Sequence, residues 1–144
     1  MTWLDVGSPG DDEYVTGVFP AEHNVAESYR WTTGSAMVTV PVPSDSRYRV
    51  DIKIATTGAE RRLTIDCPGG GLRTQLVAGK SPSDSTLECD GEAGRIPIEI
   101  EVETTRVVAD GRPLGIAVVD VRASAVETTE IFLWRLHASL AIAT

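Results

Sequence analysis

The sequence predicts an all-β protein that folds as one antiparallel β-sandwich of eight to nine strands. Apolar and polar residues alternate in at least four segments, and because successive side chains of a strand point to opposite faces, each segment has one core face and one wet face. Turn-forming residues separate these segments, with no long helical period between them. The chain has 144 residues, the length of one domain with a proper core, so we expect residues 1–144 to form a single domain.

The predicted strands follow one another along the chain. The alternation is clear at residues 36–40, 48–54, 63–65 and 96–102. Breaks rich in Pro, Gly, Ser and Asp lie beside them, at residues 41–46, 57–58, 68–71, 81–84 and 90–94. Pro97 lies inside the last of the four segments. Because proline has no amide hydrogen to donate to a neighbouring strand, we expect Pro97 at a sheet edge or beside a bulge.

The C-terminal segment, residues 127–143, has two possible structures. Its apolar residues alternate with polar ones as in a strand, at Phe132, Trp134, Leu136, Ala138, Leu140 and Ile142. A helix could instead begin at residues 128–130 and place Leu133, Leu136, Leu140 and Ala143 on one face. We favour a strand that completes the sandwich. The alternative is that this apolar tail mediates self-association.

The charge of the chain limits its partners. The net charge is -8, from 21 acidic and 13 basic residues, and such a field repels nucleic acid and anionic lipid. No apolar run of about 18 residues exists, so we expect no membrane insertion of this chain. The first residues lack the basic and apolar regions of a signal peptide. A neutral partner, such as a glycan or a protein surface, remains compatible with this charge.

The chain has two cysteines, Cys67 and Cys89, and each is in phase with apolar neighbours. Both side chains should therefore point into the core, either as two buried thiols, which we favour, or as one disulfide worth about 3 kcal/mol. Together with the scattered His23 and His137 they make a poor zinc-ligand set, so we expect no metal and no cofactor.

Three strings in a fixed order resemble a known family. They are GVFPAE at residues 17–22, YRWT at residues 29–32 and DGRPLGIAV at residues 110–118. Over about residues 4–123 this set resembles a jelly-roll-like β-sandwich domain that is appended to bacterial glycosyltransferases of polysaccharide synthesis. The resemblance implies a non-catalytic accessory module, similar to a carbohydrate-binding module, whose partner is a glycan or a glycosyltransferase domain. It also implies an extracytoplasmic location if the chain is a piece of a membrane glycosyltransferase; a complete chain without a signal peptide is expected in the cytoplasm.

The same strings supply the candidate binding residues, Trp31, Arg30, Tyr14, Asp110 and Arg112. Trp31 has two possible roles: its ring can stack on the C–H groups of a sugar, or it can fill the core beside Phe19, which we favour. Arg30 could hydrogen-bond sugar hydroxyls, but we favour a structural ion pair with a carboxylate such as Glu22 or Asp110, since a guanidinium pairs well with a carboxylate. Asp110 and Arg112 flank Gly111, where the simplest interpretation is a turn.

Other acidic and glycine-rich segments do not indicate catalysis. The N-terminal acidic residues Asp5, Asp11, Asp12 and Glu13 could hold calcium, but their spacing favours a solvated loop. Residues 99, 101 and 103 are glutamates on the wet side of an amphipathic strand, not an acid–base pair. Neither a phosphate loop nor a nucleophile elbow is present. We therefore expect no enzyme activity. The alternative to the accessory module is a structural or assembly protein that self-associates through its sandwich surface and C-terminal tail.

Overall fold

The computed structural model describes residues 1–106 and 112–126. Within these residues it has one short 3-10 turn and twelve strands, of which nine have four or more residues and three have two. The elements are β1 (Thr2–Asp5), η1 (Asp11–Glu13), β2 (Val15–Val18), β3 (Glu22–His23), β4 (Ser28–Pro41), β5 (Arg47–Ala55), β6 (Arg61–Cys67), β7 (Gly71–Val77), β8 (Ser83–Asp90), β9 (Arg95–Val102), β10 (Thr105–Arg106), β11 (Pro113–Leu114) and β12 (Ala117–Ala125). All pairings are antiparallel, so the predicted all-β sandwich is confirmed.

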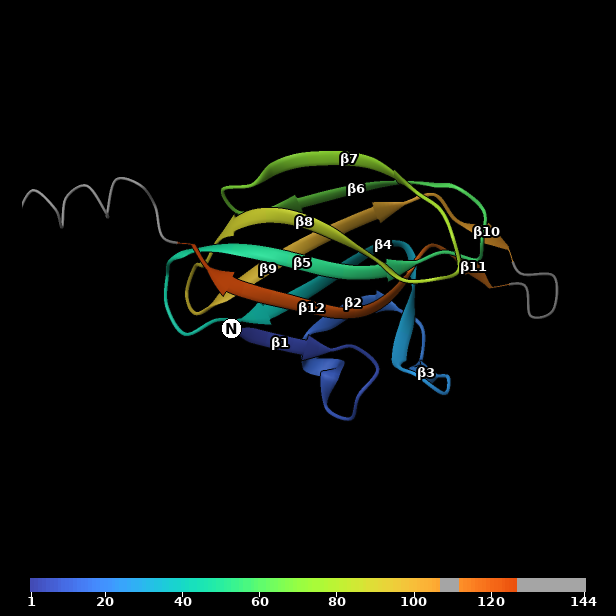
Figure 1. Cartoon of the computed structure of the whole chain (residues 1–144), viewed down its shortest axis with the longest axis horizontal. Coiled ribbons are helices and arrows are strands. Elements are labelled where there is room, and N and C mark those ends of the chain that lie inside the picture. The colour runs from blue at the N-terminus through green and yellow to red at the C-terminus, as the bar shows by residue number, and fades with distance from the viewer. Residues whose placement is uncertain (107–111, 127–144) are drawn as a thin grey trace, which may run out of the picture.

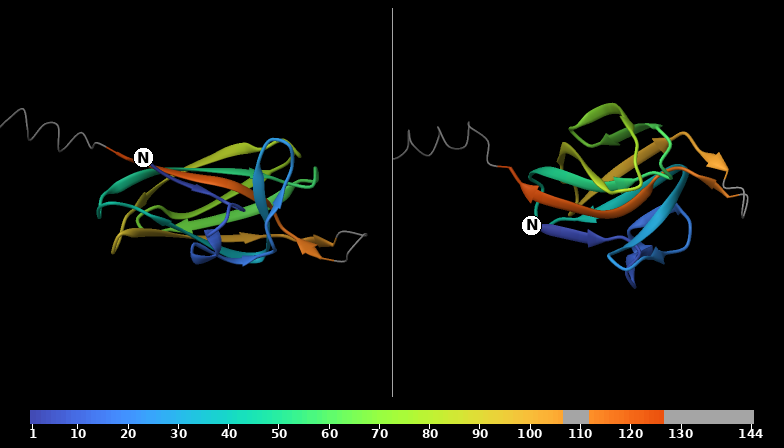
Figure 2. Two further views of the ribbon diagram at one scale, coloured as in Figure 1. Left: turned by 90° about the horizontal axis from the view of Figure 1, so that it is seen from below. Right: turned by 45° about the vertical axis from the view of Figure 1, so that its right-hand side comes forward.

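The strands form one continuous sheet that curls into two layers. The order is β7-β6-β9-β4-β12-β5-β8, with β1 added to β12 and with β2 and β3 added to β4. In Figure 1 the layer β1-β12-β5-β8 lies in front, and β9 and β4 pass behind it. Figure 2 (left) shows the two layers edge-on. The short hairpin β10–β11 is a separate sheet.

Strand β4 joins the two layers. Its first part pairs with β12 of the front layer, at Arg30 and Trp31, and its second part pairs with β9 of the back layer from Ser35 onward. The change occurs next to Gly17 of β2, which has a φ of 70° and lies so close that a Cβ there would be 2.1 Å from the carbonyl oxygen of Ser35. A glycine is therefore required at this point of the GVFPAE string.

The core lies between the layers and uses the apolar positions that the alternation predicts. Its largest fully buried side chains come from β5, β6 and β9 and include Ile52, Ile54, Leu63, Ile65, Ile96, Ile98 and Ile100. Their polar neighbours in sequence face water, as the exposed Glu99 and Glu101 of β9 show. The core is one connected cluster that also includes residues of β1, β4, β8 and β12.

Proline 97 is accommodated as expected. On one side of β9, strand β4 pairs with it from Arg95 to Glu101. On the other side, β6 pairs only with the residues from Glu99 onward, so β9 has an unpaired side at Pro97. The missing amide hydrogen therefore leaves no ladder partner unsatisfied.

The two cysteines form a disulfide between Cys67 of β6 and Cys89 of β8. Both side chains are buried, as predicted, but the favoured prediction of two free thiols is wrong. Strand β6 belongs to the back layer and β8 to the front one, so the bond links the two layers at one end of the sandwich, where the Cα atoms are 5.8 Å apart.

Two predicted features fall on residues that the structure does not describe. They are the tail at residues 127–143 and the candidate residue Asp110. In the described part of the chain, no helix is long and apolar enough to cross a membrane.

Candidate functional site

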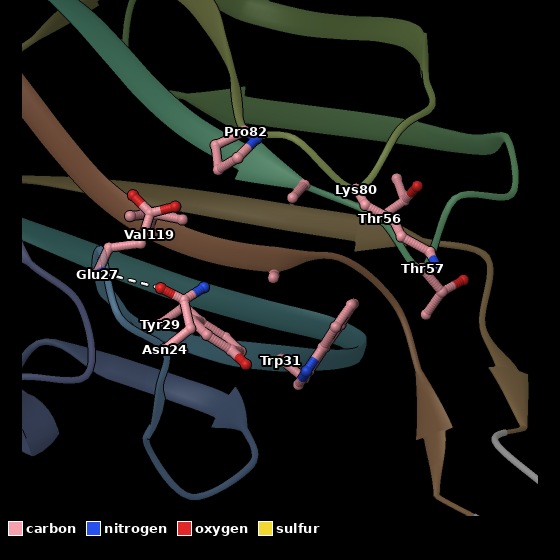
Figure 3. Close-up of a pocket in the computed structure, with 11 residues that line it drawn as sticks. Asn24, Glu27, Tyr29, Trp31, Thr56, Thr57, Lys80, Pro82 and Val119 are labelled. Carbon is pink, nitrogen blue, oxygen red and sulfur yellow. Dashed lines mark hydrogen bonds between the residues drawn. The ribbon is translucent and has the colours of Figure 1, made fainter.

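A groove of about 260 Å³ opens on the outer side of the front layer (Figure 3). It lies where the β3–β4 hairpin, the end of β5, the loop before β8 and the start of β12 meet. Aromatic and polar side chains form its walls, and small apolar ones form its floor. The walls are Asn24, Glu27, Tyr29, Trp31, Thr56, Thr57, Lys80 and Pro82, and the floor is Ala55, Ala117 and Val119.

The aromatic wall follows from the alternation of β4. Tyr29 and Trp31 are two residues apart, so both point to the outer face, while Arg30 and Thr32 point inward. The two rings meet edge to face, with centroids 6.3 Å apart and planes at 89°. Both residues are half-buried, which leaves ring surface exposed to the groove.

The floor is made by small residues in register and by a bulge. Ala117 lies opposite Trp31 on one side and opposite Ala55 on the other, so short side chains leave space beside the indole. The pairing of β12 with β5 shifts between Val118 and Asp120. The bulge aims Val119 at the groove, while Val118 remains fully buried in the core.

The start of β12 is held by one buried threonine of β4. The hydroxyl of Thr32 accepts a hydrogen bond from the amide of Ile116 at 3.1 Å, and its carbonyl accepts one from Gly115 at 2.9 Å. These bonds lie at the gap between β11 and β12. They also set the position of Ala117 beneath the groove.

Polar groups of fixed orientation complete the groove. The carboxylate of Glu27 lies 3.2 Å from the ammonium group of Lys53. The side-chain oxygen of Asn24 accepts hydrogen bonds from the amides of Ala26 and Glu27, at 2.9 and 3.0 Å, so its amide nitrogen points the other way (Figure 3). An aromatic wall with a few oriented polar groups suits a ligand that has an apolar face and a hydroxylated edge.

Trp31 is the predicted site residue that lines the groove. It is not part of the buried core cluster, and the ring of Phe19 lies instead against the guanidinium of Arg112, 5.2 Å from ring centroid to Cζ. The favoured prediction, that Trp31 fills the core beside Phe19, is therefore not what the structure shows.

Arg30 is an ion-paired residue, but its partners are not the predicted ones. Its Nε and Nη2 donate to the two carboxylate oxygens of Asp11 at 2.8 and 2.7 Å, and Nη2 also donates to Asp12 at 2.7 Å. The hydrogen bonds to Asp11 raise the pKa of the Arg30 guanidinium. The prediction that Arg30 pairs with Glu22 is wrong, because Arg30 pairs with Asp11 and Asp12, and a carboxylate oxygen of Glu22 lies 3.7 Å from Nη1 of Arg112. The reason is the turn η1, which directs Asp11 inward beneath Arg30.

Two further predicted residues, Tyr14 and Arg112, do not line the groove. Tyr14 follows η1 and packs against the core. Arg112 contacts Phe19 and Glu22 near the β11 end of the molecule. Asp110 lies outside the described residues. The three strings of the sequence do meet in space. The amide of Ile116 donates to the hydroxyl of Thr32, and the amide of Phe19 donates to the carbonyl oxygen of Trp31. These contacts connect backbone segments and do not by themselves form a binding site.

Asp11, one of the N-terminal acidic residues considered for calcium, has a structural role instead. Asp11 is 3% exposed and accepts a hydrogen bond from the amide of Gly7 at 2.7 Å, in addition to its pair with Arg30, so the N-terminal acidic segment is not simply a solvated loop. The described residues contain no group of three or more side chains arranged to hold a metal ion.

Several groove residues were not among the predicted ones. Tyr29 could have been found, because it is two residues before Trp31 and shares its face. Asn24, Glu27, Thr57 and Lys80 come from turns that the sequence places far apart, and no local pattern indicates that they converge.

Comparisons with solved structures define the fold. A family 35 carbohydrate-binding module from Clostridium thermocellum matches 88% of this chain and 100% of its own length, with a TM-score of 0.57 and 12% identity. A β-(1,4)-mannanase from Podospora anserina that carries a family 35 carbohydrate-binding module matches 88% of this chain and 28% of its own, with a TM-score of 0.58 and 17% identity. An exo-β-1,3-galactanase from Phanerochaete chrysosporium matches 85% of this chain and 29% of its own, with a TM-score of 0.56 and 11% identity.

The chain therefore has the jelly-roll β-sandwich fold of carbohydrate-binding modules. It spans less than a third of the mannanase and of the galactanase. No family model matches the sequence, and no curated protein does. At these identities the likeness concerns the fold alone.

Proposed function

We propose that this protein is a non-catalytic carbohydrate-binding module whose binding site is the groove lined by Tyr29 and Trp31. The observation that carries the proposal is the edge-to-face pair of half-exposed rings over a floor of small residues. Aliphatic C–H groups of a sugar pack on the electron-rich face of an aromatic ring and leave the hydroxyls free to hydrogen-bond. The fold supports this function, because carbohydrate-binding modules share it.

The polar groups of the groove suit binding better than hydrolysis. Glycoside hydrolysis uses two carboxyl groups that flank the scissile bond. Among the described residues that line the groove, Glu27 is the carboxylate, and it is paired with Lys53 at 3.2 Å. Asn24, Thr57 and Lys80 supply hydrogen-bond donors at the edge of the groove, where sugar hydroxyls would lie.

A glycan array on monodisperse protein tests the proposal, followed by titration of the hits. Trp31→Ala and Tyr29→Ala should each weaken binding by about 30-fold or more, since truncation of a central aromatic contact typically costs about 2 kcal/mol. Val25→Ala is the matched control, because Val25 is fully exposed on the same hairpin but does not line the groove. Binding that survives both aromatic substitutions, or an array without any ligand, would refute the proposal.

The finer proposal is that the module serves bacterial polysaccharide synthesis beside a glycosyltransferase. The resemblance of the three strings supports it, and the comparison with chains about three times as long is compatible with a module that accompanies an enzyme. Binding on the array to bacterial polysaccharides is the expected result. Binding confined to the mannans and galactans named for the structural neighbours would contradict this role while leaving carbohydrate binding intact.

One observation favours a second candidate function, self-association. Strand β7 is the last strand of the back layer, pairs only with β6, and exposes Leu72 and Leu76 by 73% and 60%. It contains neither Pro nor Lys, which commonly protect such edges. If two copies pair antiparallel about Thr74, Leu72 of one lies opposite Leu76 of the other, so the strand is complementary to itself.

Light scattering across a concentration series tests this candidate. A dimer that Leu72→Lys abolishes is the expected result, with Val25→Lys as the control for an added charge. A dimer that persists in Leu72→Lys but disappears on deletion of residues 127–144 would place the contact at the tail, and a monomer throughout would refute both routes.

A further inference from the structure

Trp3 is a large aromatic residue that the groove does not use. It lies on β1, and it is 56% exposed, whereas Leu4 beside it is buried in the core. Its ring is held in place by its surroundings: the guanidinium of Arg122 lies over it with Cζ 5.9 Å from the ring centroid. Trp3 therefore presents a flat aromatic surface to solvent in a defined position.

Trp3 and the groove lie on the same face of the same layer. Trp3 is opposite Arg122 in the pairing of β1 with β12, and Trp31 is opposite Ala117 in the pairing of β4 with β12. Cross-strand partners point to one side of a sheet. Val118, Val121 and Ala123 of β12 belong to the core cluster, whereas Ala117, Asp120 and Arg122 do not and lie on the opposite, outer face. Strands β1 and β4 thus flank the same edge of β12, one after the other, as Figure 1 shows for β1.

The distance between the two aromatic positions is set by β12. Arg122 is five positions after Ala117, and the bulge between Val118 and Asp120 takes up one of them. At about 3.3 Å per residue the span along the strand is roughly 13–16 Å. That span exceeds one sugar ring and corresponds to several rings in a row.

The surface between them is polar. The ion pair of Lys53 with Glu27 crosses β12 there, and Arg122 lies 3.6 Å from Asp120 on the Trp3 side. These side chains are neutralised in pairs, so the strip presents hydrogen-bonding groups without a strong net field. A neutral chain of hydroxyl groups can follow such a strip, whereas an ionic ligand gains little from it.

We propose that Trp3 is a second stacking position of the carbohydrate site, so that the ligand is an oligosaccharide that runs along the outer face of β12 from the Tyr29–Trp31 groove to Trp3. The inference rests on the proposed function of the groove. The cost of ordering Trp3 on binding is small, because the guanidinium of Arg122 already lies against its ring. Short ligands occupy the groove alone, and longer ones reach Trp3.

Indole N–H signals in a proton–nitrogen NMR spectrum test this inference. The signals of Trp3 and Trp31 are assigned with Trp3→Phe and Trp31→Phe, and the probes are gluco-, manno- and galacto-oligosaccharides from the disaccharide to the hexasaccharide, together with oligosaccharides of any array hit. The expected result is that disaccharides shift the Trp31 signal alone and the longest binding oligosaccharide shifts both signals.

Affinity provides the second measurement. Trp3→Ala should leave disaccharide affinity unchanged and lower the affinity for the longest oligosaccharide by about tenfold, to the level of a ligand that fills the groove alone. Leu72→Ala, an exposed apolar residue on the other layer, is the matched control. A long ligand that shifts Trp31 but not Trp3, with Trp3→Ala equal to wild type, would overturn this inference and leave the groove in place. Ligands that shift neither signal would instead overturn the proposed function itself.

Discussion

The pair of Arg30 with Asp11 should be the ionic interaction on which folding depends most. The Asp11 side chain is 1% exposed and that of Arg30 is 13% exposed, so the two charges meet largely out of water. Arg30→Ala leaves the Asp11 carboxylate with its bond to the amide of Gly7 and removes two charge-assisted hydrogen bonds of 2.8 and 2.7 Å. Removing one partner of a buried pair costs about 3–5 kcal/mol.

The cost of Arg30→Ala should be at the lower end of that range, because part of the guanidinium reaches solvent beside the exposed Asp12. We therefore expect a loss of about 3 kcal/mol in the free energy of unfolding, measured by urea denaturation at neutral pH. For a domain of this size that corresponds to a fall in Tm of about 6–12 °C. Arg30→Lys should recover part of the loss, since an ammonium group keeps the charge but cannot make the two-point contact.

Arg49→Ala is the matched control. Arg49 lies 3.5 Å from Asp51 with 62% of its side chain exposed, so its removal should cost less than about 1 kcal/mol. A double-mutant cycle with Asp11→Ala measures the coupling directly, and we expect it to exceed about 1.5 kcal/mol. If Arg30→Ala were no more destabilising than Arg49→Ala, the interpretation of Arg30 as the residue that holds η1 against β4 would be wrong.

Three further predictions concern the core and the outer face. Replacing both Cys67 and Cys89 by Ala, or reducing the disulfide, should lower the free energy of unfolding by about 3 kcal/mol, measured by urea denaturation with and without reductant. Thr32→Val should cost about 1–3 kcal/mol in the same measurement, because the buried amide of Ile116 loses its acceptor; an unchanged midpoint would contradict this. Burial raises the pKa of Asp120 in the folded protein, so the folded state binds a proton at Asp120 more readily than the unfolded state does. The contribution of Asp120 to stability therefore falls as the pH rises from the pKa of the unfolded state through the higher pKa of the folded state. Asp120→Asn should therefore gain stability relative to wild type from acidic to neutral pH, and a constant difference would contradict the sign.

The layers of the fold were predictable because they depend on one local rule. In β5, β6 and β9 a single face is buried, so every second residue must be apolar, and the segments and their turns can be located without knowledge of their neighbours. The long β4 was found only in its second half, since its first half changes layer and carries aromatic and charged residues in succession.

The groove and the ion pair of Arg30 depend on contacts that no local rule encodes. Lys80 reaches the groove from a loop roughly fifty residues after Trp31 in the sequence. The chain has 21 acidic residues, and the sequence does not indicate which of them pairs with Arg30. Asp11 is the partner because the turn η1 places its carboxylate against Arg30. The disulfide was missed for the same reason: two cysteines on the core faces of separate strands become partners only when the two layers pack on each other.

The alternation at the start of β4 also separates substitutions that affect the groove from substitutions that affect the framework. Tyr29 and Trp31 look outward to the groove, whereas Arg30 and Thr32 look inward and are held by Asp11 and Ile116. Substitutions at the first two positions can alter what the groove accepts while the second two preserve the framework. The fold is therefore a suitable scaffold for libraries randomised at positions 29 and 31, where the groove can be varied without loss of the contacts that hold the framework.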